Sequence, residues 1–292
     1  QKTEDIDIFL NPVTQKLFEP GSIFKPITMA AGLDTAKITP ETTYVDTGAV
    51  QIGGYTIKNA AERNYGLSSM TKVLEKSINT GAVFVERQTG EENFKKYVEA
   101  FGFDRPTGID LAGESSGNIS NLKSGREINF ATASFGQGIA VTPIQMASAI
   151  SVIANGGKLM KPYLVDKIVY PDGQEKKTEP IMTRQVVSER TAAKLTAMLV
   201  STVRNGYDKI KLDRYFVAGK TGTAQIPSPD GGYSDEYIHS FVGYAPAYDP
   251  KFLIFIKMDK PAGITFASDS LSPVFADMAQ YLLNYYEVPP EE

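Results

Sequence analysis

Over its first two thirds the chain repeats its hydrophobic positions with the period of an α-helix. This pattern predicts helices at residues 23–33, 67–88, 92–101, 143–154 and 188–203, the second with a break near 79–81. Glycine or asparagine, which commonly end helices, lies at or just after the end of the first, third, fourth and fifth. Residues 143–154 are apolar on most faces, so we expect a buried helix there.

The last third of the chain changes to short β-rich runs. Residues 215–218, 240–244 and 252–256 are rich in aromatic and β-branched side chains, and turn-prone residues at 247–250 join the last two. We expect an antiparallel sheet, covered by a helix at 273–286 through its apolar face. A strand is also expected at 5–10, so near residue 1 that we expect an upstream segment to have been removed.

These elements indicate the α+β class. We expect an antiparallel β-sheet covered by N- and C-terminal helices, and a mostly helical subdomain at roughly residues 35–205. No linker long enough to separate independent domains interrupts the sequence. We therefore expect a single domain over residues 1–292.

The composition argues against several kinds of binding partner and metal site. The 30 basic and 34 acidic residues give a net charge of −4, which leaves no surplus for a phosphate backbone and argues against nucleic acid as a partner. With no cysteine and one histidine, the chain lacks the ligands that zinc and most transition metals prefer. We expect side-chain chemistry without a metal or a cofactor.

The spacing Ser-x-x-Lys occurs three times, at Ser22/Lys25, Ser69/Lys72 and Ser120/Lys123. Residues three apart share a helix face, so a hydroxyl and an amine can meet there. Pro26 indicates that the helix holding the first pair is only beginning. Ser22 would then lie at a helix N-terminus, where N–H groups and the dipole stabilise negative charge. The second pair fits a solvated helix face, and the third lies in a polar loop.

Two further short motifs accompany the Ser-x-x-Lys motif. Ser77-Ile78-Asn79 lies at the predicted helix break, and Lys220-Thr221-Gly222 occurs once, after the predicted strand 215–218. A second Ser-x-Asn, at 116–118, lies in a polar loop. The order S-x-x-K, S-x-N, K-T-G is the signature of class A β-lactamases and penicillin-binding proteins.

With these motifs the chain resembles the transpeptidase domain of class B penicillin-binding proteins, the monofunctional enzymes of cell elongation and division. The resemblance extends to residues 19–26 (EPGSIFKP), 76–83 (KSINTGAV), 107–111 (TGIDL), 134–143 (SFGQGIAVTP), 217–225 (VAGKTGTAQ) and 241–246 (FVGYAP), and so to nearly the whole chain. It implies a β-lactamase/transpeptidase-like fold with the active site between the sheet and the helical subdomain.

The resemblance implies a serine acyl-enzyme formed on a D-Ala-D-Ala stem peptide. Ser22 would be the nucleophile, Lys25 its proton acceptor, and Ser77, assisted by Lys220, the proton relay to the leaving amine. The backbone N–H groups of Ser22 and Thr223 would form the oxyanion hole. The implied substrate-binding residues are Asn79, Thr221, Gly222, Thr223 and Gln225, with the two threonines on the terminal carboxylate and Asn79 on a peptide amide.

A lysine base needs a lowered pKa. An ordinary lysine titrates near pH 10.4, so its deprotonation at pH 7 costs about 4.6 kcal/mol. Burial and a second cation both lower a lysine pKa, and Lys220 is the expected second cation for Lys25. Ile78 stands where the family often has a small or polar residue, and we expect its side chain to point away from the site.

The resemblance also implies partners and a location. The partners are peptidoglycan stem peptides, β-lactam antibiotics that acylate Ser22, and a membrane glycan polymerase reached through an N-terminal anchor and pedestal outside this sequence. The location is the extracytoplasmic face of the bacterial cytoplasmic membrane. The alternatives are a D,D-carboxypeptidase or a β-lactamase, which pass the acyl group to water, and a β-lactam-sensing module that acylates without turnover.

Two other patterns resemble motifs of other protein families. Gly219-Lys220-Thr221 matches the end of a phosphate-binding loop, but Arg214 stands where the earlier glycine is required. Residues 113–117 (GESSG) match the nucleophile elbow of α/β-hydrolases, with His239 downstream as a base. That elbow needs a strand, a sharp turn and a helix, and a polar loop follows Ser115, so we expect His239 to be a packed or surface residue.

Overall fold

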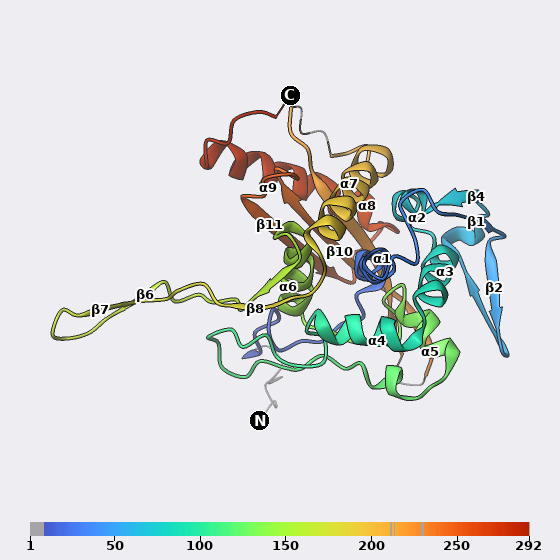
Figure 1. The fold of residues 1–292 in the computed structure, drawn as a ribbon, viewed down its shortest axis with the longest axis horizontal. Coiled ribbons are helices and arrows are strands. Elements are labelled where there is room, and N and C mark those ends of the chain that lie inside the picture. Colours follow the sequence, from blue (N-terminus) through green and yellow to red (C-terminus); the bar gives the residue numbers. More distant parts are fainter. Residues whose placement is uncertain (1–8, 211, 213, 229–230, 292) are drawn as a thin grey trace.

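The computed structural model describes residues 9–210, 212, 214–228 and 231–291 (Figure 1). Its central sheet is antiparallel, in the order β11–β10–β9, from β9 (Ala218–Pro227), β10 (Tyr233–Ala245) and β11 (Phe252–Asp259). β10 and β11 contain the predicted runs 240–244 and 252–256. Most of the strand predicted at 5–10 lies outside the described residues.

The strand predicted at 215–218 is wrong. Tyr215 and Phe216 precede the sheet because the C-terminal tail holds them: the Tyr215 hydroxyl donates to the Val288 carbonyl at 2.7 Å, and the Phe216 N–H to a Glu291 carboxylate oxygen at 2.7 Å. β9 begins only at Ala218. The K-T-G residues therefore lie inside a strand and not after one.

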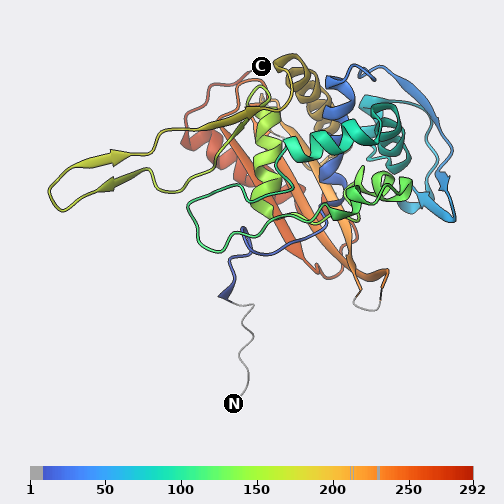
Figure 2. The same ribbon diagram turned by 60° about the horizontal axis from the view of Figure 1, so that its bottom comes forward.

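Helices cover both faces of this sheet, which confirms the predicted architecture. Side chains of β10 alternate between two cores: the Phe241 ring lies 4.5 Å from that of Phe275 on α9 (Ser272–Tyr285), and the Tyr244 hydroxyl lies 2.8 Å from that of Thr196 on α7 (Glu189–Gly206). α6 (Pro143–Ala154) packs beside α7 on the second face (Figures 1 and 2).

A buried helix runs through the centre of the molecule (Figure 1). α1 (Lys25–Asp34) follows a 3₁₀ turn at Gly21–Phe24, and nine of its ten residues are buried. Such a helix has to be apolar all round, and Lys25 is the charged exception among its buried residues. Burying a lysine in that position lowers the stability of the fold, which indicates that Lys25 has a function.

The helix predicted at 67–88 is three elements. Leu67 lies in β4 (Gly66–Ser69), then come α2 (Met70–Glu75) and α3 (Asn79–Thr89). A break is present but lies at 76–78, not at the predicted 79–81, which form the first turn of α3: Ser77 adopts the left-handed backbone, with φ of 55°. The remaining helices are α4 (Glu91–Ala100), α5 (Glu127–Ala133) and α8 (Ala267–Ser270).

Segment 35–205 also carries two-stranded β-pairs that the sequence pattern did not indicate. The pairs are β1 (Thr43–Asp46) with β4, β2 (Ala49–Ile52) with β3 (Tyr55–Lys58), β5 (Lys158–Met160) with β8 (Met182–Gln185), and β6 (Lys167–Val169) with β7 (Glu175–Lys177). Figures 1 and 2 show the β6–β7 ribbon projecting away from the body. Within the described ranges, none of the helices has the length and apolarity to cross a bilayer.

Candidate active site

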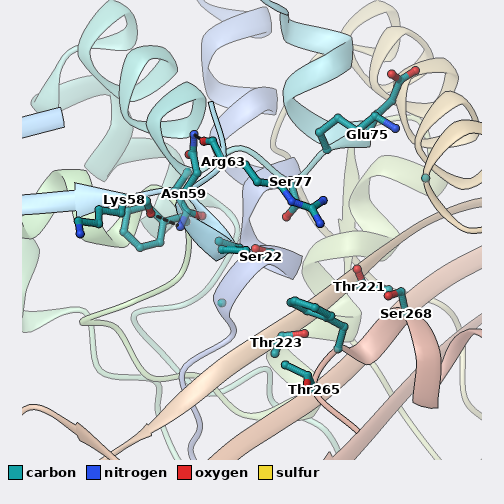
Figure 3. Close-up of a pocket in the computed structure, with 18 of the residues that line it drawn as sticks. Ser22, Lys58, Asn59, Arg63, Glu75, Ser77, Thr221, Thr223, Thr265 and Ser268 are labelled. Carbon is teal, nitrogen blue, oxygen red and sulfur yellow. Dashed lines mark hydrogen bonds between the residues drawn. The ribbon is translucent and has the colours of Figure 1, made fainter. Parts of the chain in front are cut away.

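A cleft of about 800 Å³ opens between the β9 edge of the sheet and the helical layer (Figure 3). Most of the predicted site residues line it: Ser22, Ser77, Asn79, Thr221, Thr223 and Gln225. Lys25 and Lys220 lie beneath its floor, each only 1% exposed. The three motifs, far apart in the sequence, therefore meet in one place.

Glycines fix the chain at Ser22. The Gly21 N–H donates to the Gly136 carbonyl at 2.9 Å, and a Cβ on Gly136 would lie 2.2 Å from the Gly21 oxygen. Gly136 also has a φ of 82°, which favours glycine. Next to it, the Gly138 N–H donates to a Glu19 carboxylate oxygen at 3.0 Å. Residues 134–143 thus hold the turn that presents Ser22.

The edge strand β9 closely approaches this turn. A Cβ on Gly222 would lie 2.5 Å from the Ser240 hydroxyl and 3.0 Å from the Pro20 carbonyl oxygen, so a larger residue would push the strand away. Gly222 itself does not line the cleft, but it lets the neighbouring Thr221 and Thr223 do so. The glycine of K-T-G is a packing requirement between strand and turn.

Lys25 makes three polar contacts from its buried position. Its Nζ lies 2.5 Å from the Ser77 carbonyl oxygen, 3.1 Å from Ser77 Oγ and 2.7 Å from Asn79 Oδ1. An ammonium group has three N–H donors and no acceptor, so this arrangement satisfies a protonated lysine. The described chain has no hydrogen bond between the side chains of Ser22 and Lys25, contrary to what their spacing predicts, because the Nζ donors of Lys25 are taken by the S-x-N residues.

The surroundings nevertheless favour the neutral form of Lys25. Burial, and then the nearby positive charge of Lys220, lower its pKa well below the ordinary value. Lys220 donates to Ser77 Oγ at 3.0 Å, to the Tyr207 hydroxyl at 3.2 Å and to the Thr221 carbonyl at 3.2 Å. Both causes are those expected from the sequence.

Ser77 is the junction between the two lysines. A hydroxyl oxygen has two lone pairs, and the two ammonium groups use both of them. The Ser77 proton is then left to point toward the cleft, which the residue lines. Ile78 is fully buried in the hydrophobic core, which confirms that its side chain points away from the site.

Tyr207 is a residue of the site that sequence reasoning missed. It is the residue after α7, is 6% exposed, and lines the cleft. Its hydroxyl accepts from Lys220 at 3.2 Å and from the Thr221 N–H at 3.0 Å, and it lies 3.0 Å from the Thr221 hydroxyl oxygen. Its position directly after the predicted helix and the Asn205-Gly206 stop is the one feature of the sequence that points to it.

A buried carboxylate holds the wall of the cleft opposite β9. Asp46 accepts from the side chains of Asn59 and Thr80 and from the N–H groups of Gly48 and Tyr65. Burial alone would raise the pKa of Asp46, but these hydrogen bonds outweigh it and lower the pKa. The wall from Asn59 to Tyr65 is therefore tied to the start of α3.

Arg63 is a second missed feature of that wall. Its guanidinium reaches over the cleft near Ser77 (Figure 3). It gives the wall a positive charge.

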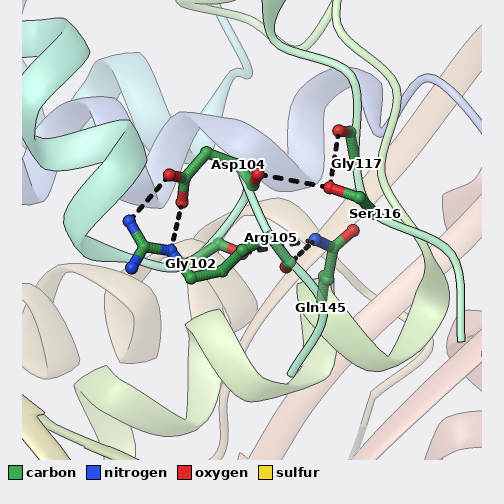
Figure 4. Close-up of polar contacts among 6 residues, drawn as sticks. All are labelled: Gly102, Asp104, Arg105, Ser116, Gly117 and Gln145. Atoms are coloured by element: carbon green, nitrogen blue, oxygen red, sulfur yellow. Dashed lines mark hydrogen bonds and ion pairs between the residues drawn. The ribbon is translucent and has the colours of Figure 1, made fainter. Parts of the chain in front are cut away.

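The loop that matched a nucleophile elbow is structural. The Ser115 hydroxyl donates to the Gln15 carbonyl at 3.0 Å, and that of Ser116 to the Asp104 carbonyl at 3.2 Å. Gln145 of α6 supports the neighbouring loop by donating to the Gly102 and Arg105 carbonyls (Figure 4). His239 contacts Ser270 and Thr265, and not this loop.

Comparisons with known proteins agree with this arrangement. The family model described as the penicillin binding protein transpeptidase domain matches residues 1–280. Stage V sporulation protein D of Bacillus subtilis is 36% identical, over 94% of this chain and 43% of the relative. Peptidoglycan D,D-transpeptidase FtsI of Escherichia coli is 29% identical, over 96% of this chain and 46% of the relative.

A crystal structure of penicillin binding protein 3 from Mycobacterium tuberculosis, complexed with aztreonam, superposes with a TM-score of 0.89 and 31% identity. The match covers 99% of this chain and 68% of the chain in that crystal structure. The chain spans less than half the length of the two curated relatives. By motif order, fold and the family model, the chain belongs to the penicillin-binding protein transpeptidase domains.

Proposed function

We propose that this domain is a serine-type peptidoglycan D,D-transpeptidase, in which Ser22 forms the acyl-enzyme. The observation that carries the proposal is the chain of hydrogen bonds from Lys25 through Ser77 to Lys220, set beneath a cleft lined by Ser22 and the β9 threonines. Burial and the charge of Lys220 lower the pKa of Lys25, which favours the neutral amine that has to accept the proton of a serine nucleophile.

In the proposed reaction, Ser22 Oγ attacks the carbonyl carbon of the penultimate D-alanine of a stem peptide, and its proton passes to neutral Lys25. For this transfer Lys25 has to release one of its present contacts and turn toward Ser22. The N–H groups of Ser22 and Thr223 would stabilise the oxyanion. The Ser77 proton reaches the leaving nitrogen, and Ser77 is reprotonated by the lysines. Free D-alanine departs, leaving the acyl-enzyme.

An amine from a neighbouring stem peptide then attacks the acyl carbon, gives up a proton through the same groups and restores the Ser22 hydroxyl. Asn79, Gln225 and the β9 threonines would hold the peptide, with the threonines on its terminal carboxylate. β-Lactams would acylate Ser22 through the same steps. We also propose that the domain works at the extracytoplasmic face of the bacterial membrane, next to a glycan polymerase.

The test is intact mass spectrometry after incubation with benzylpenicillin. We expect the wild-type domain to gain the mass of one benzylpenicillin and the Ser22→Ala variant to gain nothing. Ser115→Ala, which alters the serine of the elbow-like loop, is the matched control and should be acylated like the wild type. An adduct on Ser22→Ala would refute the proposal.

The lifetime of the adduct separates transfer from hydrolysis. A β-lactamase would release the antibiotic within the assay, whereas a transpeptidase keeps it. Incubation with a donor thioester and a D-amino acid acceptor then distinguishes a transpeptidase from a sensor, because only the transpeptidase forms the amide product.

A further inference from the structure

His239 has no part in the proton transfers above, yet it lies next to the carboxylate-binding side of the cleft. It is fully buried on β10, and its partner in the sheet register is Thr223 on β9. It is also the one histidine of the sequence. A buried, titratable ring thus lies directly beside a residue that lines the cleft.

The two ring nitrogens contact the two ends of one short segment. Nε2 lies 3.2 Å from the Thr265 carbonyl oxygen, and Nδ1 lies 2.8 Å from Ser270 Oγ. A carbonyl can only accept, so the proton of the neutral ring is on Nε2, and Nδ1 accepts from the Ser270 hydroxyl. Burial lowers the pKa of His239, in accord with a neutral ring.

The middle of the same segment contacts Thr223. The Ala267 N–H, at the start of α8, donates to Thr223 Oγ1 at 3.0 Å. This donor occupies one lone pair of the hydroxyl, so the Thr223 proton is directed away from Ala267 and remains available to a ligand. Thr265 and Ser268 of the segment line the cleft, and Thr265 lies beside Thr223 (Figure 3).

The hydroxyl of Thr221 has a different partner from that of Thr223. The Thr221 hydroxyl contacts that of Tyr207 at 3.0 Å, and not residues 265–270. A carboxylate accepts hydrogen bonds and cannot donate them. Of the two β9 threonines, Thr223 is therefore the one whose hydroxyl residues 265–270 orient for donation to a ligand carboxylate.

We infer that His239 is a positioning residue for carboxylate recognition: it holds residues 265–270 against β9 so that the Ala267 N–H orients the Thr223 hydroxyl toward the cleft. The inference rests on the proposed function, since it concerns the carboxylate of the substrate or β-lactam. It assigns a role in binding to a side chain that does not itself touch the ligand.

The test compares benzylpenicillin with its methyl ester, which lacks the carboxylate charge. We expect His239→Phe to slow acylation by benzylpenicillin about tenfold and acylation by the ester less than twofold. His239→Gln, which keeps a donor for the Thr265 carbonyl, should recover part of the loss. In a Thr223→Val background the His239→Phe change should have no further effect. A loss equal for both ligands, or additive with Thr223→Val, would overturn the inference.

A second measurement uses only the wild-type domain, so it does not require any variant to fold. Long-range ¹H–¹⁵N NMR of the wild-type domain gives one set of histidine ring signals, which reports the tautomer directly. We expect the neutral ring protonated on Nε2 at pH 7, and a proton on Nδ1 would contradict the proposed contacts. A wild-type domain that benzylpenicillin acylates, but whose His239→Phe variant discriminates against the ester as before, would refute this inference and leave the proposed function standing. Absence of wild-type acylation would overturn both.

Discussion

Lys25 and Lys220 donate to the same oxygen, Ser77 Oγ, from 3.1 and 3.0 Å. Two ammonium groups that share an acceptor disfavour each other's charge. The contact therefore couples the protonation of the proposed base to a residue on the opposite side of the cleft.

Removal of the second cation should shift the pH dependence of acylation. Because Lys25 must be neutral to accept a proton, the acylation rate should rise with pH through its lowered pKa, well below 10.5. In Lys220→Met the inflection should move to higher pH, yet stay below 10.5, since burial of Lys25 persists. Stopped-flow acylation by a fluorescent penicillin between pH 5 and 10 measures this.

Lys123→Met is the matched control, because Lys123 is the exposed lysine of the third Ser-x-x-Lys pair. Its profile should match the wild type. An inflection in Lys220→Met at the wild-type pH or below it would contradict the coupling.

Tyr207→Phe should impair acylation with little effect on folding. The change removes only the hydroxyl that contacts Lys220 and Thr221, while the packing of the ring on Phe241 remains. A hydrogen bond to a charged group contributes about 1.5–3 kcal/mol, so we expect acylation to slow by about ten- to a hundredfold. Tyr281→Phe, on the exposed face of α9, should change nothing. Wild-type rates in Tyr207→Phe would exclude Tyr207 from the site.

Glu86 should make the domain less stable at alkaline pH. It is 1% exposed, one carboxylate oxygen has no hydrogen bond within the described chain, and burial together with Glu91 raises its pKa to about 7. Stability is therefore lost as the pH rises from about 4.5 through 7. Glu86→Gln should match the wild type at pH 4 and exceed it by about 3 kcal/mol at pH 8.

Urea unfolding at both pH values checks this, with Glu92→Gln on the exposed face of α4 as control. An equal gain at pH 4 and pH 8 would show that the carboxylate charge is not the cause.

Asp46→Asn should loosen the wall of the cleft. The lowered pKa of Asp46 means that the carboxylate stabilises the fold above its ordinary pKa, and that this contribution is lost as the pH falls. We expect a loss of about 2–4 kcal/mol at pH 7, and a smaller difference from the wild type at pH 3. Thermal unfolding at the two pH values is the measurement. Asp277→Asn, exposed on α9, is the control and should unfold like the wild type.

Long helices and motif residues were predictable because each leaves a local pattern. α6 and α9 match the predicted ranges within one residue, since their apolar positions repeat over three or more turns. β6 was not predictable, because all three of its residues are exposed and burial imposes no alternation. Tyr207 and Asp46 act through hydrogen bonds to segments distant in the sequence, and no spacing along the chain encodes such contacts.

Residue 77 meets two opposing requirements: its left-handed backbone favours glycine, whereas the two lysines need the serine hydroxyl. A residue with a Cβ pays about 1 kcal/mol or more there, whereas glycine does not. Ser77→Gly would relieve that strain but leave two buried lysines without the hydroxyl that accepts from both, and a hydrogen bond to a charged group contributes about 1.5–3 kcal/mol. A library selected for heat resistance and one selected for penicillin capture should therefore both retain serine at 77.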